Sequence, residues 1–301
     1  MFDVIIIGAG PAGITASVYA ARKKLNILVI SPDIGGQAAW SGDIENYTGY
    51  QFITGPDLAA KFEEHLKRYD IALKEGERAL SIKKEGALFS VTTDKDIYQA
   101  RTLIIASGKR TRELNVPGEK EFKNRGLTYC ATCDGPLFAH KVVAVIGGGN
   151  SALDAALQLE RIAKRIYVIN NVAQLGGDAV MREKVEQSPL VTVLNNTQVK
   201  EVLGEVMVKG IKVSCNGKDE VLPVEGVFVE IGLLPNSEFA TGVEKNNREE
   251  IKVNARNETN IPGIFAAGDV TDVPEKQIII AAGEGSKAAL GVFRYLIQQK
   301  N

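Results

Sequence analysis

The sequence lacks an excess of charge, long apolar runs and a large set of cysteines. Its 301 residues include 36 basic and 37 acidic side chains, and the formal net charge of −1 leaves no positive surplus to attract nucleic acid or an anionic membrane. We expect neither a leader peptide nor a membrane span, because no apolar stretch is long enough. Three cysteines cannot staple a secreted fold of this size. The composition predicts a cytoplasmic protein with no nucleic acid and no membrane as partner.

Length and a repeated pattern predict two domains. A chain of 301 residues exceeds what one hydrophobic core usually serves. Continuously apolar strands, typical of parallel sheets buried on both faces, each lead into a glycine loop. The order of strand, glycine loop, helix and strand occurs twice: at Val4–Ile7, Gly8–Gly13, Ile14–Arg22 and Asn26–Ile30, then at Val142–Ile146, Gly147–Ala152, a helix to about Ile162, and Ile166–Ile169.

Two further stretches, Ile82–Tyr98 and Val206–Val229, have the alternation and turn residues of small antiparallel sheets. Linkers are expected near Val116–Gly118 and Leu234–Asn236. The predicted fold class is α/β, with two Rossmann-like, three-layer nucleotide-binding domains that each carry a small antiparallel β insertion. The first domain is discontinuous, and the expected boundaries are 1–114 with 238–301 for the first domain and 115–237 for the second.

The first glycine loop has the spacing of a dinucleotide-binding turn. Gly8 permits the tight turn, Gly10 lets the backbone approach a pyrophosphate, and Gly13 allows close packing of the helix on the strand. The motif lies between a buried strand and a helix, which is the context it requires. Ser31 stands where a ribose-binding acid is usual, with Asp33 two residues later. A ribose contact through a backbone group or hydroxyl is therefore as open as one through a carboxylate.

The second loop points to NADH rather than NADPH. It has Ala152 in place of the third glycine, which is a permitted variant. Asn170 and Asn171 follow the next strand, where an acid would bind a ribose diol and an arginine would bind a 2′-phosphate. Amides can hydrogen-bond a diol, but they do not neutralise a phosphate dianion.

The pair Cys130 and Cys133, with Asp134 adjoining it, indicates thiol–disulfide chemistry. Two thiols separated by two residues can close a disulfide with little strain, and a neighbouring carboxylate can move the proton that exchange requires. Zinc and a purely structural thiol pair are the alternatives. Zinc needs four ligands, and only Cys215, His65 and His140 remain without metal spacing, so we expect no metal.

Further motifs accompany the glycine loops and the cysteine pair: Gly35-Gly36-Gln37, Glu45-Asn46-Tyr47, Cys130 to Phe138, Gly147 to Ser151, Glu230 to Asn236, Ala267 to Val270, and Lys276 to Ile280. With these motifs, the chain resembles over essentially its whole length the low-molecular-weight thioredoxin reductases, and its later motifs look most like the reductase half of the NADH-linked flavoprotein subunit of alkyl hydroperoxide reductase. We expect no counterpart of the extra N-terminal thioredoxin-fold domains of that subunit, and the resemblance therefore implies a separate protein substrate.

The resemblance implies that the first domain binds FAD and the second binds NADH or NADPH. It also implies that Cys133 lies nearer the flavin, that Cys130 attacks the disulfide of the partner, that Asp134 is the acid–base residue, and that the protein is a homodimer. NADPH-specific members carry a His-Arg-Arg cluster where this chain has Asn170-Asn171 and the uncharged Val172–Gly177, which again favours NADH. The implied FAD contacts are Gly8, Gly10, Pro11, Ala12, Gly13, Gly36, Gln37, Asn46, Gly108, Asp269, Val270, Gln277 and Ile278. The implied NAD(P)H contacts are Gly147, Gly149, Asn150, Ser151, Ala152, Asn170, Asn171 and Gly232.

The function predicted from the sequence is that of an FAD-dependent disulfide reductase. Electrons would pass from NADH, through FAD and the Cys130–Cys133 disulfide, to a disulfide of a thioredoxin- or glutaredoxin-like protein. Three alternatives stay open: a thioredoxin reductase fed by ferredoxin or another flavoprotein, an oxygen-using dithiol oxidase of the same fold, and a flavin-binding sensor without turnover.

Overall fold

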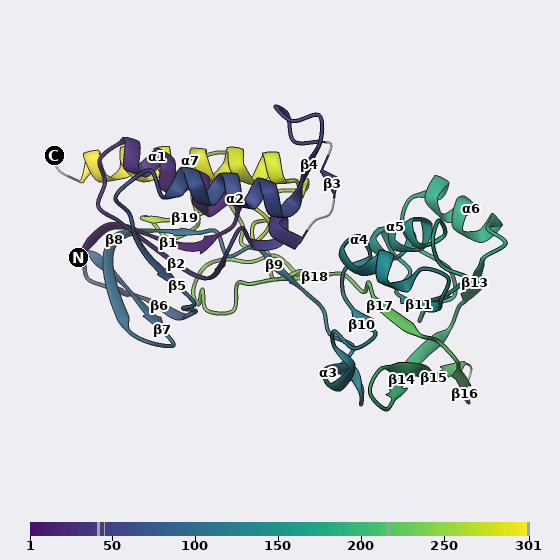
Figure 1. Ribbon diagram of the computed structural model, residues 1–301. Helices are drawn as coiled ribbons and strands as arrows, with labels where there is room; N and C mark the ends of the chain where they lie inside the picture. Colours follow the sequence, from purple (N-terminus) through teal and green to yellow (C-terminus); the bar gives the residue numbers. More distant parts are fainter. Residues whose placement is uncertain (41–42, 45, 216, 300–301) are drawn as a thin grey trace. The chain divides into compact units, whose positions relative to one another are not determined.

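The computed structural model describes residues 1–40, 43–44, 46–215 and 217–299 (Figure 1). Nothing is described for the side chains of Trp40, Asp43, Thr132 and Cys133. The chain divides into two compact units, residues 1–110 with 234–301 and residues 111–233. The boundaries expected from the sequence, 114/115 and 237/238, lie a few residues further along the chain.

The first unit is built on a mixed sheet with the spatial order β5-β2-β1-β8-β7-β6, and β19 also pairs with β8. Strands β5, β2, β1, β8 and β19 run parallel, whereas β8, β7 and β6 are antiparallel neighbours. The strands are β1 (Phe2–Ala9), β2 (Ile27–Ile34), β5 (Ala72–Glu75), β6 (Ala79–Glu85), β7 (Leu88–Thr93), β8 (Ile97–Ile105) and β19 (Ile264–Ala266). The remaining elements are α1 (Pro11–Arg22), the 3-10 helix η1 (Gly36–Trp40), the short pair β3 (Asp43–Ile44) and β4 (Ile53–Thr54), α2 (Gly55–Leu66) and α7 (Ile278–Gln298).

Strand β1 is buried on both faces of this sheet. Val4 and Ile6 belong to the core cluster formed with α1 and α7, which lie along one face (Figure 1). Ile5 and Ile7 belong to a second cluster that contains Phe89 of β7. The prediction that a continuously apolar run forms a strand buried on both sides is confirmed.

The second unit has a parallel sheet with the order β10-β17-β11-β12-β13 and an antiparallel sheet with the order β14-β15-β16. Its helices are α3 (Glu119–Phe122), α4 (Ala131–Asp134), the 3-10 helix η2 (Gly135–Phe138), α5 (Asn150–Leu159) and α6 (Ala179–Gln187). Its strands are β10 (Leu127–Thr128), β11 (Val142–Ile146), β12 (Arg165–Ile169), β13 (Val191–Leu194), β14 (Thr197–Gly204), β15 (Val208–Cys215), β16 (Lys218–Leu222) and β17 (Gly226–Val229).

The two faces of β11 separate the layers of the second unit. Val143 and Val145 pack in a cluster with residues of α5. Ala144 and Ile146 pack in another cluster with Ile211 of β15. Helices therefore cover one face of the parallel sheet and the antiparallel sheet covers the other, which gives the expected three layers.

Two details of the expected organisation are wrong. The stretch Val206–Val229 is not one antiparallel patch, because Gly226–Val229 joins the parallel sheet between β10 and β11. Its residues 227–229 are all buried, as a central parallel strand requires, rather than alternating between core and solvent.

The expected linker at Val116–Gly118 lies inside the second unit, where the carbonyl of Pro117 accepts a hydrogen bond from the Val202 amide at 2.9 Å. The chain instead passes between the units within β9 (Lys109–Thr111) and β18 (Leu233–Pro235), which pair with each other.

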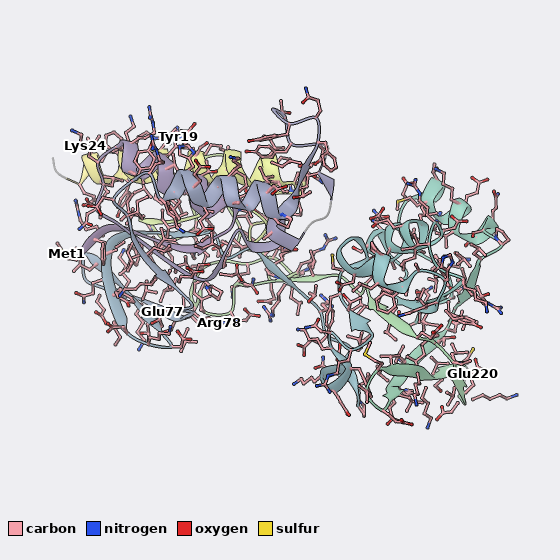
Figure 2. The ribbon with its side chains drawn as sticks, in the orientation of Figure 1. Met1, Tyr19, Lys24, Glu77, Arg78 and Glu220 are labelled. Carbon is pink, nitrogen blue, oxygen red and sulfur yellow. The ribbon has the colours of Figure 1, made fainter. Side chains whose placement is uncertain are left out.

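Polar side chains also fix the antiparallel part of the first sheet. Glu77, labelled in Figure 2, is buried. It accepts hydrogen bonds from the hydroxyls of Thr93 at 2.5 Å and Tyr98 at 3.3 Å. Burial and this contact raise the pKa of Tyr98 to about 12. Across the described ranges, the helices are too short or too polar to span a membrane.

Candidate active site

The first glycine loop leaves the amides at the start of α1 without a side-chain cap. Gly8 has a φ of +108°, and a Cβ there would lie 2.2 Å from the carbonyl oxygen of Ala106. A Cβ at Gly13 would meet the Gly8 carbonyl oxygen at 1.8 Å, so the helix and the loop pack too closely for a side chain. Gly10 is the N-cap of α1 and provides no capping side chain, whereas Thr54 caps α2 with its hydroxyl. An uncapped helix N-terminus behind a close-packed glycine turn suits the pyrophosphate of a dinucleotide.

Ser31 takes part in the internal structure of the loop. Its hydroxyl accepts a hydrogen bond from the Ala9 amide at 3.1 Å and donates to the Asp33 carbonyl oxygen at 2.6 Å. Ser31 is buried and Asp33 is exposed. The hydroxyl thus holds the end of β2 against the glycine loop.

Residues far apart in the sequence meet within the first unit. The Asn46 amide donates to the Gln277 side-chain oxygen at 3.1 Å, and the Gln37 amide donates to the Lys109 carbonyl oxygen at 3.0 Å. Gln277 is the N-cap residue of α7, and Ile278 is its first residue. The structure therefore brings the predicted site residues Asn46 and Gln277 together and holds Gln37 against the strand β9.

Asp269 and Val270 follow β19 at a turn that a buried glutamate holds in place. The Glu284 carboxylate accepts the Gly268 amide at 2.8 Å, and no sequence pattern points to this contact. Val270 is fully buried. Burial raises the pKa of Asp269, although the positive charges of Lys276 and Lys109 oppose that rise.

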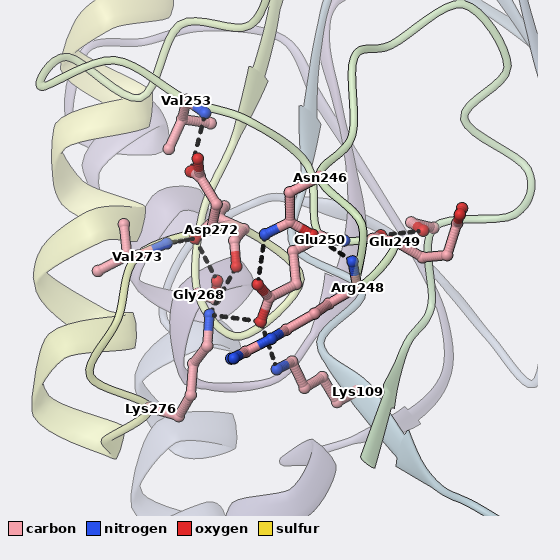
Figure 3. A network of polar contacts seen from close by, with 12 residues as sticks. Lys109, Asn246, Arg248, Glu249, Glu250, Val253, Gly268, Asp272, Val273 and Lys276 are labelled. Carbon is pink, nitrogen blue, oxygen red and sulfur yellow. Dashed lines mark hydrogen bonds and ion pairs between the residues drawn. The ribbon is translucent and has the colours of Figure 1, made fainter.

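A charged network lies beside this turn (Figure 3). The Glu250 carboxylate is 2.7 Å from the Lys109 ammonium and 3.5 Å from the Lys276 ammonium, and it accepts the Asn246 side-chain amide at 2.7 Å. Burial opposes ionisation of Glu250, but these donors and charges outweigh it and lower its pKa to about 2. No local spacing reveals this network, because Lys109 and Glu250 are 141 residues apart.

The second glycine loop has the same construction. Gly147 has a φ of +137°, and a Cβ there would lie 2.3 Å from the carbonyl oxygen of Glu230. Gly149 is the N-cap of α5 and supplies no capping side chain, and a Cβ there would meet nothing within 4 Å. Asn150 is engaged within the unit: its side-chain oxygen accepts the Asp178 amide at 2.7 Å. The loop therefore leaves open space at Gly149 and at the first turn of α5, where Ser151 is exposed and Ala152 is buried.

The two asparagines after β12 have different environments. Asn170 is buried, and its amide donates to the Val172 carbonyl oxygen at 3.1 Å and to the Asn195 side-chain oxygen at 2.8 Å. Its oxygen lies so close to Gly148 that a Cβ there would be 2.4 Å away. Asn171 is exposed. Asn170 therefore packs against Gly148 of the loop, and Asn171 is the asparagine exposed at the surface.

The redox pair lies at the start of α4. Cys130 is disulfide-bonded and Cys215 of β15 is a reduced thiol, while the side chain of Cys133 lies outside the described residues. The Thr128 hydroxyl accepts the Cys130 amide at 3.2 Å and donates to the Asp134 carboxylate. One hydroxyl therefore ties the predicted acid–base residue to the backbone of the cysteine. Among the described residues, no group of three or more His, Cys, Asp or Glu side chains is arranged to hold a metal ion.

Glu230 lies in the same region and was not predicted as a site residue. Its carboxylate accepts a hydrogen bond from the Ala131 amide, immediately after Cys130. Burial raises the pKa of the Glu230 carboxyl to about 7. The hydrogen bond from the Ala131 amide opposes this rise, and the negative charge of Asp154 adds to it. The sequence holds one signal for this residue, an acid at the end of the apolar run Val227-Phe228-Val229. Gly232, two residues later, has a φ of +95°.

Comparison with known proteins identifies the family of this chain. Residues 2–285 match the family model described as pyridine nucleotide-disulphide oxidoreductase. The protein named NADH dehydrogenase of Bacillus subtilis (strain 168) is 43% identical over 300 residues, and the F subunit of the alkyl hydroperoxide reductase of Pseudomonas putida is 46% identical over 304 residues. Both alignments cover 99% of this chain but only 59% and 58% of those proteins, so the chain spans less than two thirds of the curated relatives it matches.

Comparison with solved structures points to the same family. The thioredoxin reductase of Lactococcus lactis superposes with a TM-score of 0.85 at 32% identity, covering 99% of this chain and 100% of that one. The thioredoxin reductase of T. acidophilum superposes with a TM-score of 0.82 at 36% identity, covering 98% of this chain and 99% of that one.

Proposed function

The chain belongs to the pyridine nucleotide-disulphide oxidoreductase family, and from that premise we propose that it carries electrons from NADH, through FAD and the disulfide of Cys130, to a disulfide of a thioredoxin- or glutaredoxin-like protein. It is an enzyme of this family with the fold of thioredoxin reductases, and its cofactors are FAD and a nicotinamide nucleotide. The observation that carries the proposal is the disulfide at Cys130, in the same unit as a glycine loop that opens onto an uncapped helix.

The first unit is proposed to hold FAD. Its glycine loop would receive the pyrophosphate, and Gln37, Asn46 and Gln277 would lie along the flavin. When bound, FAD supplies the two-electron chemistry that links a nicotinamide to a disulfide. Asp269, with a raised pKa and two lysines nearby, would hold a hydroxyl of the cofactor.

The second unit is proposed to hold NADH. The open space at Gly149 and the first turn of α5 would receive its pyrophosphate. Asn171 would hydrogen-bond the ribose diol, and Asn170 would position the loop beneath it. Neither amide neutralises a 2′-phosphate, so NADH is favoured over NADPH.

Thiol–disulfide exchange is assigned to the residues around α4. After reduction, Cys130 would attack the disulfide of the partner, and Asp134, held by Thr128, would move the proton. Cys133 would resolve the mixed disulfide. The relatives named as subunits of alkyl hydroperoxide reductase suggest that the partner is a thioredoxin-like module that serves peroxide reduction. We further propose that the enzyme works as a cytoplasmic homodimer.

The test is an anaerobic titration of the FAD-loaded protein with NADH and then with NADPH. Wild type should take up two electrons more than its flavin alone requires, because the disulfide is a two-electron couple. The Cys130→Ser, Cys133→Ser double variant should bleach its flavin, take up no extra electrons and lose protein-disulfide reductase activity. Cys215→Ser is the matched control and should behave as wild type, since Cys215 is a reduced thiol in β15. Full reductase activity in the double variant contradicts the proposal.

A further inference from the structure

Glu230 lies between the two functional segments of the second unit. In the parallel sheet β17 lies between β10 and β11, with Thr128 paired to Phe228 and Ile146 paired to Val229. The residues that follow these strands therefore meet at one edge of the sheet: the segment carrying Cys130 on one side of Glu230, and Gly147 on the other. The Glu230 amide donates to the Ile146 carbonyl oxygen at 2.8 Å, so the backbone hydrogen bonding between β17 and β11 continues to that edge.

The backbone and the side chain of Glu230 each contact one of these segments. Its carbonyl oxygen occupies the space that a Cβ of Gly147 would fill, at 2.3 Å, so the glycine loop is shaped around it. Its carboxylate accepts the amide of Ala131, the peptide directly after the disulfide-bonded Cys130. The carboxylate therefore contacts the backbone of the redox segment one residue after Cys130.

The environment of Glu230 differs from that of a structural carboxylate. Glu230 is half-buried, whereas Glu119 of the same unit is fully buried. Glu119 accepts hydrogen bonds from the amides of Leu114 and Asn115 at 2.6 Å each and from the Tyr129 hydroxyl at 2.9 Å. Glu230 instead has the Ala131 amide as its donor, and the charge acting on it is a second carboxylate, that of Asp154 on α5.

Asp134 of α4, in the segment that follows Cys130, is held by the Thr128 hydroxyl. Burial and Asp154 bring the pKa of Glu230 to about 7, so it gains and loses a proton at neutral pH.

We propose that Glu230 is the proton relay of the disulfide, a role that rests on the proposed reductase function. Reduction breaks the S–S bond and adds two electrons, and a neutral dithiol also requires two protons. The hydride from NADH brings both electrons and one proton. The protonated Glu230 carboxyl supplies the second proton to the sulfur that leaves as thiolate, becomes a carboxylate, and is reprotonated from solvent. The overall balance is NADH, one proton and the partner disulfide giving NAD⁺ and the partner dithiol.

The test compares Glu230→Gln with Glu225→Gln in the FAD-loaded full chain. Glutamine keeps an oxygen to accept the Ala131 amide but carries no exchangeable acid proton. Glu225 lies just before the other end of β17, is exposed, and accepts the Val142 amide at 3.2 Å, so it is a matched control. In wild type and Glu225→Gln, the rate of disulfide reduction by NADH should fall about tenfold per pH unit above a break near pH 7. In Glu230→Gln the break should vanish and the rate below it should be about 100-fold lower.

Two readouts separate this role from a structural one. The infrared band of a protonated carboxyl should titrate near pH 7 in wild type and be missing in Glu230→Gln. Asp154→Asn should move the break to lower pH, because it removes the negative charge that opposes ionisation of Glu230. An unchanged pH profile and an unchanged band in Glu230→Gln overturn the proposal.

Chemical reduction distinguishes failure of the relay from failure of the proposed function. If NADH does not reduce the disulfide of wild type, the reductase proposal fails. The proton relay can then be tested by itself in protein reduced with dithiothreitol. The measurement is a pH titration of the thiol, followed by the ultraviolet absorbance of the thiolate. Glu230→Gln should lower the pKa of the thiol relative to wild type and Glu225→Gln, because a neighbouring negative charge has been removed. Identical thiolate titrations in all three proteins overturn the relay.

Discussion

The Lys109 ammonium lies 2.7 Å from the Glu250 carboxylate, and the two side chains are only 12% and 8% exposed. Lys276 approaches the same carboxylate at 3.5 Å, so two ammonium groups share one buried anion (Figure 3). Both lysines also act on Asp269, which follows β19. The network therefore places a positive charge beside the turn proposed to contact FAD, and it is built entirely from residues of the first unit.

Breaking this network should destabilise the first unit. Lys109→Met leaves Glu250 buried with one ammonium partner, and removing one side of a buried ion pair costs about 3 kcal/mol or more. The control is Glu238→Gln, which breaks the exposed pair with Arg110, where a loss of at most about 1 kcal/mol is expected. Urea unfolding followed by circular dichroism measures both variants. Equal losses in the two variants contradict a buried role for the Lys109–Glu250 pair.

The same carboxylate should contribute to stability in a defined acid range. The pKa of Glu250 is lowered from 4.5 to about 2, so its ionised form is favoured in the folded state. Its stabilising contribution is fully present above pH 4.5 and is lost as the pH falls towards about 2. The difference in unfolding free energy between wild type and Glu250→Gln should therefore shrink over that interval. A difference that stays constant with pH contradicts the assignment.

Local patterns predicted the contiguous parts of the fold. Val142–Ile146 was expected as a strand and β11 has the same bounds, because a buried parallel strand is a continuous apolar run between turn residues. Gly226–Val229 is also such a run, and grouping it with the alternating residues before it led to the wrong sheet. The choice between neighbouring sheets depends on strand order, which no local spacing encodes.

The residues of the candidate site divide in the same way, into those that local patterns predict and those that depend on the order of the strands. The glycine loops and the Cys-X-X-Cys pair are contiguous, so a prediction of their chemistry can be made from the amino-acid sequence alone. Glu250, Glu284 and Glu230 act through partners that strand order and loop closure bring to them. Glu284, for instance, holds the Gly268 amide at 2.8 Å from a helix, with nothing in its surroundings in the sequence to indicate that role.

The nucleotide assignment of the two units can be tested with single methyl groups. A Cβ at Gly149 meets nothing within 4 Å, and one at Gly10 meets only the Gly35 carbonyl oxygen at 4.0 Å, so the fold should tolerate alanine at both. Gly10→Ala should lose FAD on gel filtration. Gly149→Ala should keep FAD and raise the KM for NADH about tenfold, which corresponds to about 1.4 kcal/mol.

The control for added strain is Gly217→Ala in the turn between β15 and β16, where φ is +81° and no atom lies within 4 Å. It should lower stability by about 1 kcal/mol without changing either nucleotide. Loss of flavin in Gly149→Ala, or retention of flavin with weakened NADH binding in Gly10→Ala, reverses the assignment.

Nucleotide preference should respond to one exposed position. Asn171→Arg places a guanidinium after β12, where it can pair with a 2′-phosphate. We expect kcat/KM for NADPH to rise about tenfold while that for NADH stays within about twofold. Gln198→Arg adds the same charge at an exposed position of β14 and should change neither value. Equal gains for NADPH in both variants would mean that net charge, rather than a phosphate contact, is responsible.

The hydroxyl of Thr128 should matter for exchange with the partner and not for reduction by NADH. It accepts the Cys130 amide and donates to Asp134, so Thr128→Val releases the carboxylate from the hydroxyl that ties it to the backbone of Cys130. We expect Asp134→Asn to slow reduction of a protein disulfide about 100-fold, as loss of an acid–base group does, and Thr128→Val to slow it about fivefold, the effect of one hydrogen bond.

Stopped-flow mixing of the reduced enzyme with oxidised thioredoxin measures exchange, and flavin absorbance measures reduction by NADH. Thr192→Val removes a threonine hydroxyl bonded to Arg165 in the same unit and should leave both rates unchanged. A slowed flavin step in Thr128→Val places the hydroxyl in the earlier half-reaction and contradicts its assignment to exchange.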